Sequence, residues 1–113
     1  MLPKRRRLST REVEEVLKRG HSVRAEFLSA KFIKTKTPLR AAAVVQKSVA
    51  RSAVKRNHLR RALYQALGAL SAPATHIQGV FFVNRTPKAP QQPLLAFVED
   101  TQTLMKKILH SHV

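Results

Sequence analysis

One stretch of this sequence, residues 47–61, concentrates side chains that bind phosphate. It reads KSVARSAVKRNHLRR and contains no acidic residue. Arginine offers planar, fixed donors that suit phosphate oxygens, and asparagine can donate to a phosphate or a ribose hydroxyl. Like charges at helical spacing repel, so a helix face that meets only water usually mixes both signs. We interpret the stretch as a phosphate-binding face, with a merely solvated face as the alternative. Its candidate phosphate-binding residues are Lys47, Arg51, Lys55, Arg56, Asn57, His58, Arg60 and Arg61.

The residue types that perform catalysis or bind metals form no comparable cluster. The chain has no cysteine, which excludes thiolate nucleophiles, thiolate zinc sites and disulfides. Hydrolysis by two metal ions needs clustered carboxylates. Beyond the N-terminal third the acids are Glu99 and Asp100, which suit the first half of a helix, and His110 and His112 alone make a poor zinc site. We predict no catalytic residue and no metal ligand in the protein, and a protein-only nuclease is a further alternative.

The overall charge indicates a polyanionic partner. Lysine and arginine number 22 against 6 acids, a net charge of +16, and residues 27–98 contain no acid at all. Such a domain repels itself unless a polyanion supplies the opposite charge. An anionic membrane is the rival partner, but no helix pairs a basic face with exposed bulky apolar residues, and no run of about 18 apolar residues could span a bilayer. We therefore expect nucleic acid as the partner and, given the absence of cysteine, a cytoplasmic location.

A single domain spanning residues 1–113 must position these side chains, because 113 residues with 43% hydrophobic content suffice for one core. Ser9 and Glu12 form a capping box that begins a first helix, which Gly20 can end in a left-handed turn. Residues 1–8 form a basic arm, with a solvated tail as the alternative, and residues 111–113 a frayed tail.

The remaining elements alternate between strands and helices. Apolar and alternating runs predict strands at residues 21–24, 27–35, 40–46 and 77–83. A second helix begins after Ser52 and ends near Leu67, before breakers at Gly68 and residues 71–73. Its apolar stripe comprises Leu59, Leu63, Ala66, Leu67 and Leu70, opposite Asn57, Arg61 and Tyr64. A last helix begins near Pro93 and buries Leu94, Phe97, Val98, Leu104, Met105, Ile108 and Leu109. This order predicts an α+β sandwich.

Several segments together resemble the protein subunit of bacterial ribonuclease P. Residues 47–50 (KSVA) followed by 53–61 (AVKRNHLRR) resemble that family's signature helix, with His58 where the family usually has arginine and Ser48 where it has a second basic residue. Residues 83–87 (VNRTP) resemble its last strand and the following turn, and residues 18–22 (KRGHS) the segment after its first helix.

The resemblance implies a fold and a function. The fold is a two-layer α/β sandwich of about four strands and three helices, with a left-handed βαβ crossover that the usual handedness rule would not predict. The family's catalyst is a large RNA that binds Mg²⁺ and hydrolyses the phosphodiester bond at the 5′ end of mature tRNA. The protein is the monomeric, non-catalytic cofactor of that RNA. A ribosomal or other structural RNA-binding protein is the alternative from a different class.

The resemblance also implies which residues meet which RNA. Those of the signature helix and the loop before it would face the RNA subunit. They are Lys47, Arg51, Lys55, Arg56, Asn57, His58, Arg60 and Arg61. A cleft between that helix and the sheet would hold the single-stranded 5′ leader of precursor tRNA, with Phe27, Ser29, Lys31 and Arg85 as candidate contacts.

Overall fold

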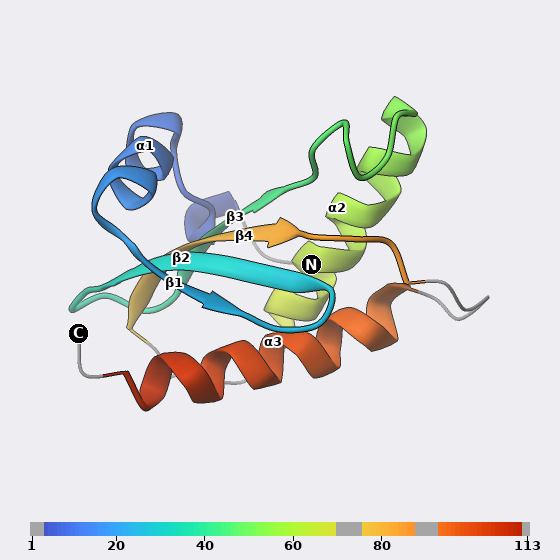
Figure 1. Cartoon of the computed structure of the whole chain (residues 1–113). Coiled ribbons are helices and arrows are strands. Elements are labelled where there is room, and N and C mark those ends of the chain that lie inside the picture. The colour runs from blue at the N-terminus through green and yellow to red at the C-terminus, as the bar shows by residue number, and fades with distance from the viewer. Residues whose placement is uncertain (1–3, 70–75, 88–92, 112–113) are drawn as a thin grey trace.

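The computed structural model describes residues 4–69, 76–87 and 93–111, and this part of the chain forms an α+β domain (Figure 1). Three α-helices and a four-stranded sheet are present in these ranges, which confirms the predicted fold class. The elements are η1 (Lys4–Arg6, a 3₁₀ turn), α1 (Thr10–Arg19), β1 (His21–Arg24), β2 (Leu28–Lys34), β3 (Arg40–Val44), α2 (Ala53–Gly68), β4 (Ile77–Val83) and α3 (Pro93–Leu109).

The sheet is mixed, with strand order β1-β2-β4-β3. β2 pairs antiparallel with both β1 and β4, whereas β3 pairs parallel with β4. β3, α2 and β4 therefore make the βαβ unit that the resemblance implies, and its left-handed sense stays a prediction. β2 and β4 pair along their whole length, from Leu28 opposite Val83 to Lys34 opposite Ile77, so these central strands fix the register of the sheet.

The two faces of the sheet are covered differently. Side chains alternate along a strand, so Leu28, Ala30 and Phe32 of β2 share one face, and all three are buried. They belong to the main hydrophobic cluster, to which α2 and α3 contribute Leu63 and Phe97. The sheet with α2 and α3 forms the predicted two-layer sandwich. On the opposite face α1 adds a smaller cluster of Val16, Ala42 and Val80.

α1 begins as predicted but ends differently. The capping box is present, because the Glu12 backbone N–H donates to Ser9 Oγ and the Ser9 N–H donates to the Glu12 carboxylate. Gly20 follows the helix with φ −75° and ψ 158°, which is extended backbone, so the predicted left-handed turn is wrong. The glycine instead permits a close approach, since a Cβ there would lie 2.4 Å from the Val16 carbonyl oxygen.

Two predicted positions on the later helices are also wrong. Tyr64 is not opposite the buried stripe of α2: it is half-buried, because its long side chain reaches β3, where its hydroxyl accepts the Ala43 N–H at 3.2 Å. Leu109 is 61% exposed, because it is the final residue of α3. Leu70, residues 71–73, His112 and residues 112–113 of the predicted tail lie outside the described residues.

The described part of the predicted basic arm lies along the sheet. Arg7 forms a parallel bridge with Ala41 of β3, and the Leu8 N–H donates to the Ala41 carbonyl at 2.9 Å. Residues 4–8 therefore extend along the outer edge of β3, which β4 pairs on its other side.

Candidate nucleic-acid interface

α2 places the polar residues of the 47–61 stretch at the protein surface. Ser52 caps the helix, since its Oγ accepts the Lys55 backbone N–H at 3.3 Å. The helix is attached to the core through a buried stripe of Leu59, Ala62, Leu63, Ala66 and Leu67. Among the predicted RNA-contacting residues, Arg56 and Arg60 are half-buried, and the exposed ones are Lys47, Arg51, Lys55, Asn57, His58 and Arg61.

The polar residues of α2 form two rows at helical spacing rather than one face. The first, the Arg60 row, consists of Asn57, Arg60 and Tyr64, and Arg60 Nη1 donates to Asn57 Oδ1 at 2.7 Å. The second, the Arg61 row, consists of His58, Arg61 and Gln65, and it borders a hollow of about 290 Å³ together with Pro93 and Leu94 at the start of α3. The Arg61 row therefore faces the start of α3, whereas Tyr64 of the Arg60 row reaches β3.

Arg56 holds the loop that precedes α2. Its Nη1 donates to the carbonyl oxygens of Ala50 at 3.0 Å and Arg51 at 2.7 Å. The guanidinium thereby fixes the backbone that carries Arg51, whose own side chain is exposed. The structure thus adds to Arg56 a positioning role that the basic run alone does not indicate.

The cations of α2 and its preceding loop have no carboxylate partners among the described residues. The ion pairs in these ranges join Arg19 to Glu15, Arg40 to Glu12 and Arg85 to Glu26, and none of them includes a residue of α2. Charge that is neither buried nor paired within the protein remains available for an anionic partner. Within the described ranges, no helix is both long enough and apolar enough to cross a membrane.

A second candidate surface is a hollow of about 310 Å³ on the sheet face that α1 partly covers. Ser29 and Lys31, two of the predicted leader contacts, line it. Lys31 Nζ donates to the Leu17 carbonyl at 3.2 Å, which ties the strand to the end of α1. The hollow lies on the sheet itself rather than between α2 and the sheet, where the predicted cleft was expected.

The other two predicted leader contacts, Phe27 and Arg85, lie together at the end of the strands. The Arg85 guanidinium carbon is 5.1 Å from the centre of the Phe27 ring. Arg85 Nη2 also donates to Glu26 Oε1 at 3.2 Å. The Asn84 N–H donates to the Phe27 carbonyl at 2.7 Å, which joins the two segments. Phe27 and Arg85 are thus adjacent to each other and do not line the hollow that contains Ser29 and Lys31.

Sequence reasoning missed residues that border this hollow. Phe82 and Arg24 line it, and Phe82 lies opposite Ser29 in the sheet. Next to them, Ser29 Oγ donates to Asn84 Oδ1 at 2.8 Å, and Asn84 Nδ2 is buried without a partner in the described ranges. Alternation along residues 77–83 could have placed Phe82 on one face, but the register with residues 28–34 decides which side chains it meets.

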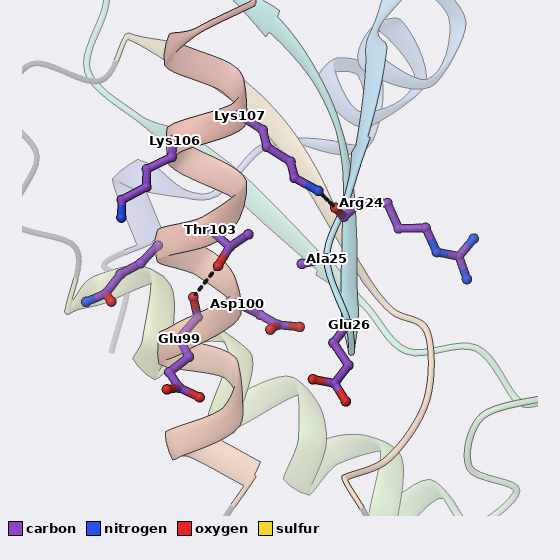
Figure 2. Close-up of a pocket in the computed structure, with 9 residues that line it drawn as sticks. Arg24, Ala25, Glu26, Glu99, Asp100, Thr103, Lys106 and Lys107 are labelled. Atoms are coloured by element: carbon purple, nitrogen blue, oxygen red, sulfur yellow. Dashed lines mark hydrogen bonds between the residues drawn. The ribbon is translucent and has the colours of Figure 1, made fainter.

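A hollow of about 770 Å³ lies between α3 and the β1–β2 connection. Figure 2 shows Glu26, Glu99 and Asp100 around it. Asp100 Oδ2 accepts the backbone N–H groups of Phe27 at 2.5 Å and Leu28 at 3.0 Å, so this carboxylate anchors β2 to α3. The described residues contain no group of three or more histidine or acidic side chains that could hold a metal ion.

The fold matches solved structures of bacterial proteins. A Staphylococcus aureus RNase P protein mutant aligns with a TM-score of 0.76 at 18% identity, covering 94% of this chain and 90% of that one. The RNase P protein from Thermotoga maritima aligns with a TM-score of 0.73 at 19% identity, covering 89% and 96%. At these identities the likeness establishes the fold. Comparison with individually curated protein sequences gives no match.

A family comparison links the sequence itself to these proteins. The model of the family described as Ribonuclease P matches residues 2–109, which include every described element. Because that match covers nearly all of the 113 residues, the chain belongs to the ribonuclease P protein family.

Proposed function

We propose that this protein is the cofactor of the ribonuclease P ribozyme, and that α2 with its preceding loop binds the catalytic RNA subunit. The observation that carries the proposal is the set of cations on α2 that no carboxylate of the described ranges neutralises. Family membership indicates a subunit of ribonuclease P. The contacts that we assign to the RNA subunit are Lys47, Arg51, Lys55, Arg56, Asn57, His58, Arg60 and Arg61.

The open sheet face supports the second part of the proposal, the binding of the 5′ leader of precursor tRNA. A single strand needs cations that follow its backbone and a ring on which a base can stack. Lys31 and Arg24 supply the first, and Phe82 supplies the second. Phe27 and Arg85 would meet the strand where it passes the end of β2, and Ser29 lies between the two groups.

The protein would act by bringing two polyanions together. Precursor tRNA and the RNA subunit repel each other, and a cationic protein that contacts both reduces that repulsion and releases counterions. In this proposal the Mg²⁺ ions that drive hydrolysis are held mainly by the RNA, and the protein contributes no reacting group. One monomer would bind one RNA subunit in the cytoplasm.

Reconstitution tests the proposal. The purified protein alone should leave precursor tRNA intact, and the RNA subunit alone should cleave it only at high Mg²⁺. Adding the protein to the RNA should produce correct 5′ maturation at low Mg²⁺. Cleavage by the protein without RNA would contradict the proposal. Recovery of ribosomal RNA after crosslinking, without ribozyme RNA or precursor tRNA, would favour a structural RNA-binding protein instead.

A further inference from the structure

We propose that η1 and α2 form one continuous surface for the RNA subunit, and that Arg40 and Glu12 are positioning residues that hold η1 in it. The inference rests on the proposed function, because it takes the RNA subunit as the partner. It extends the contact surface beyond the signature helix α2 to the N-terminal turn η1. The added contact residues are Lys4, Arg5 and Arg6.

The N-terminal segment is attached to the sheet through its backbone. Arg7 bridges to Ala41 in parallel register, and the Leu8 N–H donates to the Ala41 carbonyl at 2.9 Å. The Arg7 N–H donates to the Lys4 carbonyl at 3.0 Å, which closes the η1 turn. These bonds place the turn beside the outer edge of β3 rather than leaving it as a free tail.

Arg40 holds this attachment through both of its terminal nitrogens. Nη2 donates to the Arg7 carbonyl at 3.1 Å, and Nη1 contacts the Glu12 carboxylate. Glu12 is itself fixed, because it accepts the Ser9 N–H at 2.9 Å as part of the α1 capping box. The Ser9 N–H is also the main reason that the pKa of Glu12 lies below its usual value; burial opposes this effect, and Arg40 reinforces it.

Tyr64 joins the N-terminal segment to α2. The Arg7 guanidinium carbon lies 4.4 Å from the centre of the Tyr64 ring, which is cation–π geometry. Tyr64 belongs to the Arg60 row, so Arg7, Tyr64, Arg60 and Asn57 follow one another across the surface. The Tyr64 hydroxyl accepts the Ala43 N–H, which fixes the ring in the position where Arg7 meets it.

The charge of η1 is directed outward. Lys4, Arg5 and Arg6 are exposed, and the ion pairs of the described ranges do not include them. The nearby Glu12 is already engaged by Arg40 and Ser9, so it does not neutralise them.

The test is equilibrium binding of the full-length protein to the RNA subunit over a range of salt concentrations. The variant Lys4→Gln/Arg5→Gln/Arg6→Gln should lower the slope of log affinity against log salt by about 2 to 3, because each lost phosphate contact lowers it by about 0.7 to 0.9. The control variant Lys36→Gln/Lys106→Gln/Lys107→Gln removes the same charge elsewhere and should change the slope by less than about 1.

A positioning role for Arg40 has its own readout. Arg40→Lys keeps the charge but cannot reach both partners, so we expect several-fold weaker RNA binding than wild type. In the background of the η1 triple variant, Arg40→Lys should have no further effect on binding. An equal loss in both backgrounds would mean that Arg40 only stabilises the fold, and would overturn its role as a positioning residue.

Two failures are distinguishable. If the wild type binds the RNA subunit but the η1 variant and the control variant have equal slopes, the segment only covers the edge of β3 and the inference is wrong. If the wild type does not bind the RNA subunit in preference to an unrelated structured RNA, the proposed function itself fails.

Discussion

The helices α1 and α2 carry charge in opposite ways. On α1, Glu15 pairs with Arg19, and Glu12 accepts bonds from Ser9 and Arg40. On α2, cations follow one another at helical spacing, and the described ranges supply no carboxylate to pair with them. Glu12, Glu15 and Arg19 of α1 are thus engaged within the fold, whereas the cations of α2 are left for an anionic partner.

The same contrast appears in how the helices begin. Ser9 takes part in a reciprocal capping box with Glu12 at the third helical position. Ser52 caps α2 in one direction only, since the residue at its third helical position is Lys55. An acid at that position would stabilise the helix start and would also bring negative charge to the proposed RNA surface. The start of α2 thus lacks the stabilisation of a full capping box at the surface where we expect the RNA to bind.

The largest effect should separate the buried stripe of α2 from its exposed rows. Leu63 is fully buried, and Leu63→Ala should lower the free energy of unfolding by about 2 to 5 kcal/mol, because it leaves a cavity in the core. The exposed Arg61, two positions earlier, should change it by less than about 0.5 kcal/mol when replaced by Gln. Urea denaturation measures both. The reverse order would mean that the helix is rotated from the described orientation.

A somewhat smaller effect should distinguish an acid used by the fold from an exposed one. Asp100→Ala leaves the N–H groups of Phe27 and Leu28 without their acceptor and should cost about 1 to 3 kcal/mol. Glu99→Ala, at the neighbouring exposed position, should have little effect on thermal unfolding. Both variants should retain RNA-dependent cleavage when assayed below their melting temperatures. Loss of cleavage in Glu99→Ala would instead support a catalytic carboxylate.

Removing either helix cap should lower the free energy of unfolding by a smaller amount, and the loss should be greater for α1 than for α2. Ser9→Ala breaks both bonds of the capping box and should cost about 1 kcal/mol. Ser52→Ala breaks one bond and should cost nearer to about 0.5 kcal/mol. Chemical denaturation of the two variants, with Thr103→Ala on α3 as a non-cap control, gives the comparison. A larger loss at Ser52 than at Ser9 would contradict the contrast between the helices.

The smallest effect concerns the pH dependence of stability. The pKa of Glu12 is lowered in the folded protein from its ordinary value of 4.5. Its stabilising contribution is therefore fully present above pH 4.5 and is lost as the pH falls through the folded-state pKa. The Tm difference between wild type and Glu12→Gln should be largest near pH 7 and should shrink below pH 4.5. Glu15→Gln is the control, and a difference that widened in acid would refute the assignment.

The sequence predicted the elements better than it predicted which surfaces they make. The capping box of residues 9–12 and the alternation of residues 28–34 are local signals, and both are confirmed. The predicted position of Tyr64 was wrong because helical spacing alone cannot show that a long side chain bends back to reach β3. The predicted conformation of Gly20 was wrong because this glycine permits a close contact with the helix end. The presence of a glycine after a helix does not distinguish that role from a left-handed turn.

In the candidate site, too, local features could be predicted from the sequence and long-range contacts could not. The basic run on α2 lies within one element, so the exposure of Asn57 and Arg61 could be predicted from helical spacing. The hollow with Ser29, Lys31 and Phe82 depends on the pairing of β2 with β4, two strands far apart in the chain. The carbonyl contacts of Arg56 and the position of Arg7 over Tyr64 likewise depend on the folded path of the backbone.

The central claim, that the cations of α2 bind RNA whereas those of α1, which share their helix with acidic residues, do not, is tested most directly by matched charge removal. Lys55→Gln/Arg60→Gln/Arg61→Gln and the α1 variant Arg11→Gln/Lys18→Gln/Arg19→Gln remove the same charge. Binding of each to the RNA subunit is measured across salt concentrations. The account predicts that the α2 variant lowers the log–log slope by about 2 to 3 and the α1 variant by less than about 1. Equal slopes for the two variants would contradict it, because binding would then depend on net charge alone.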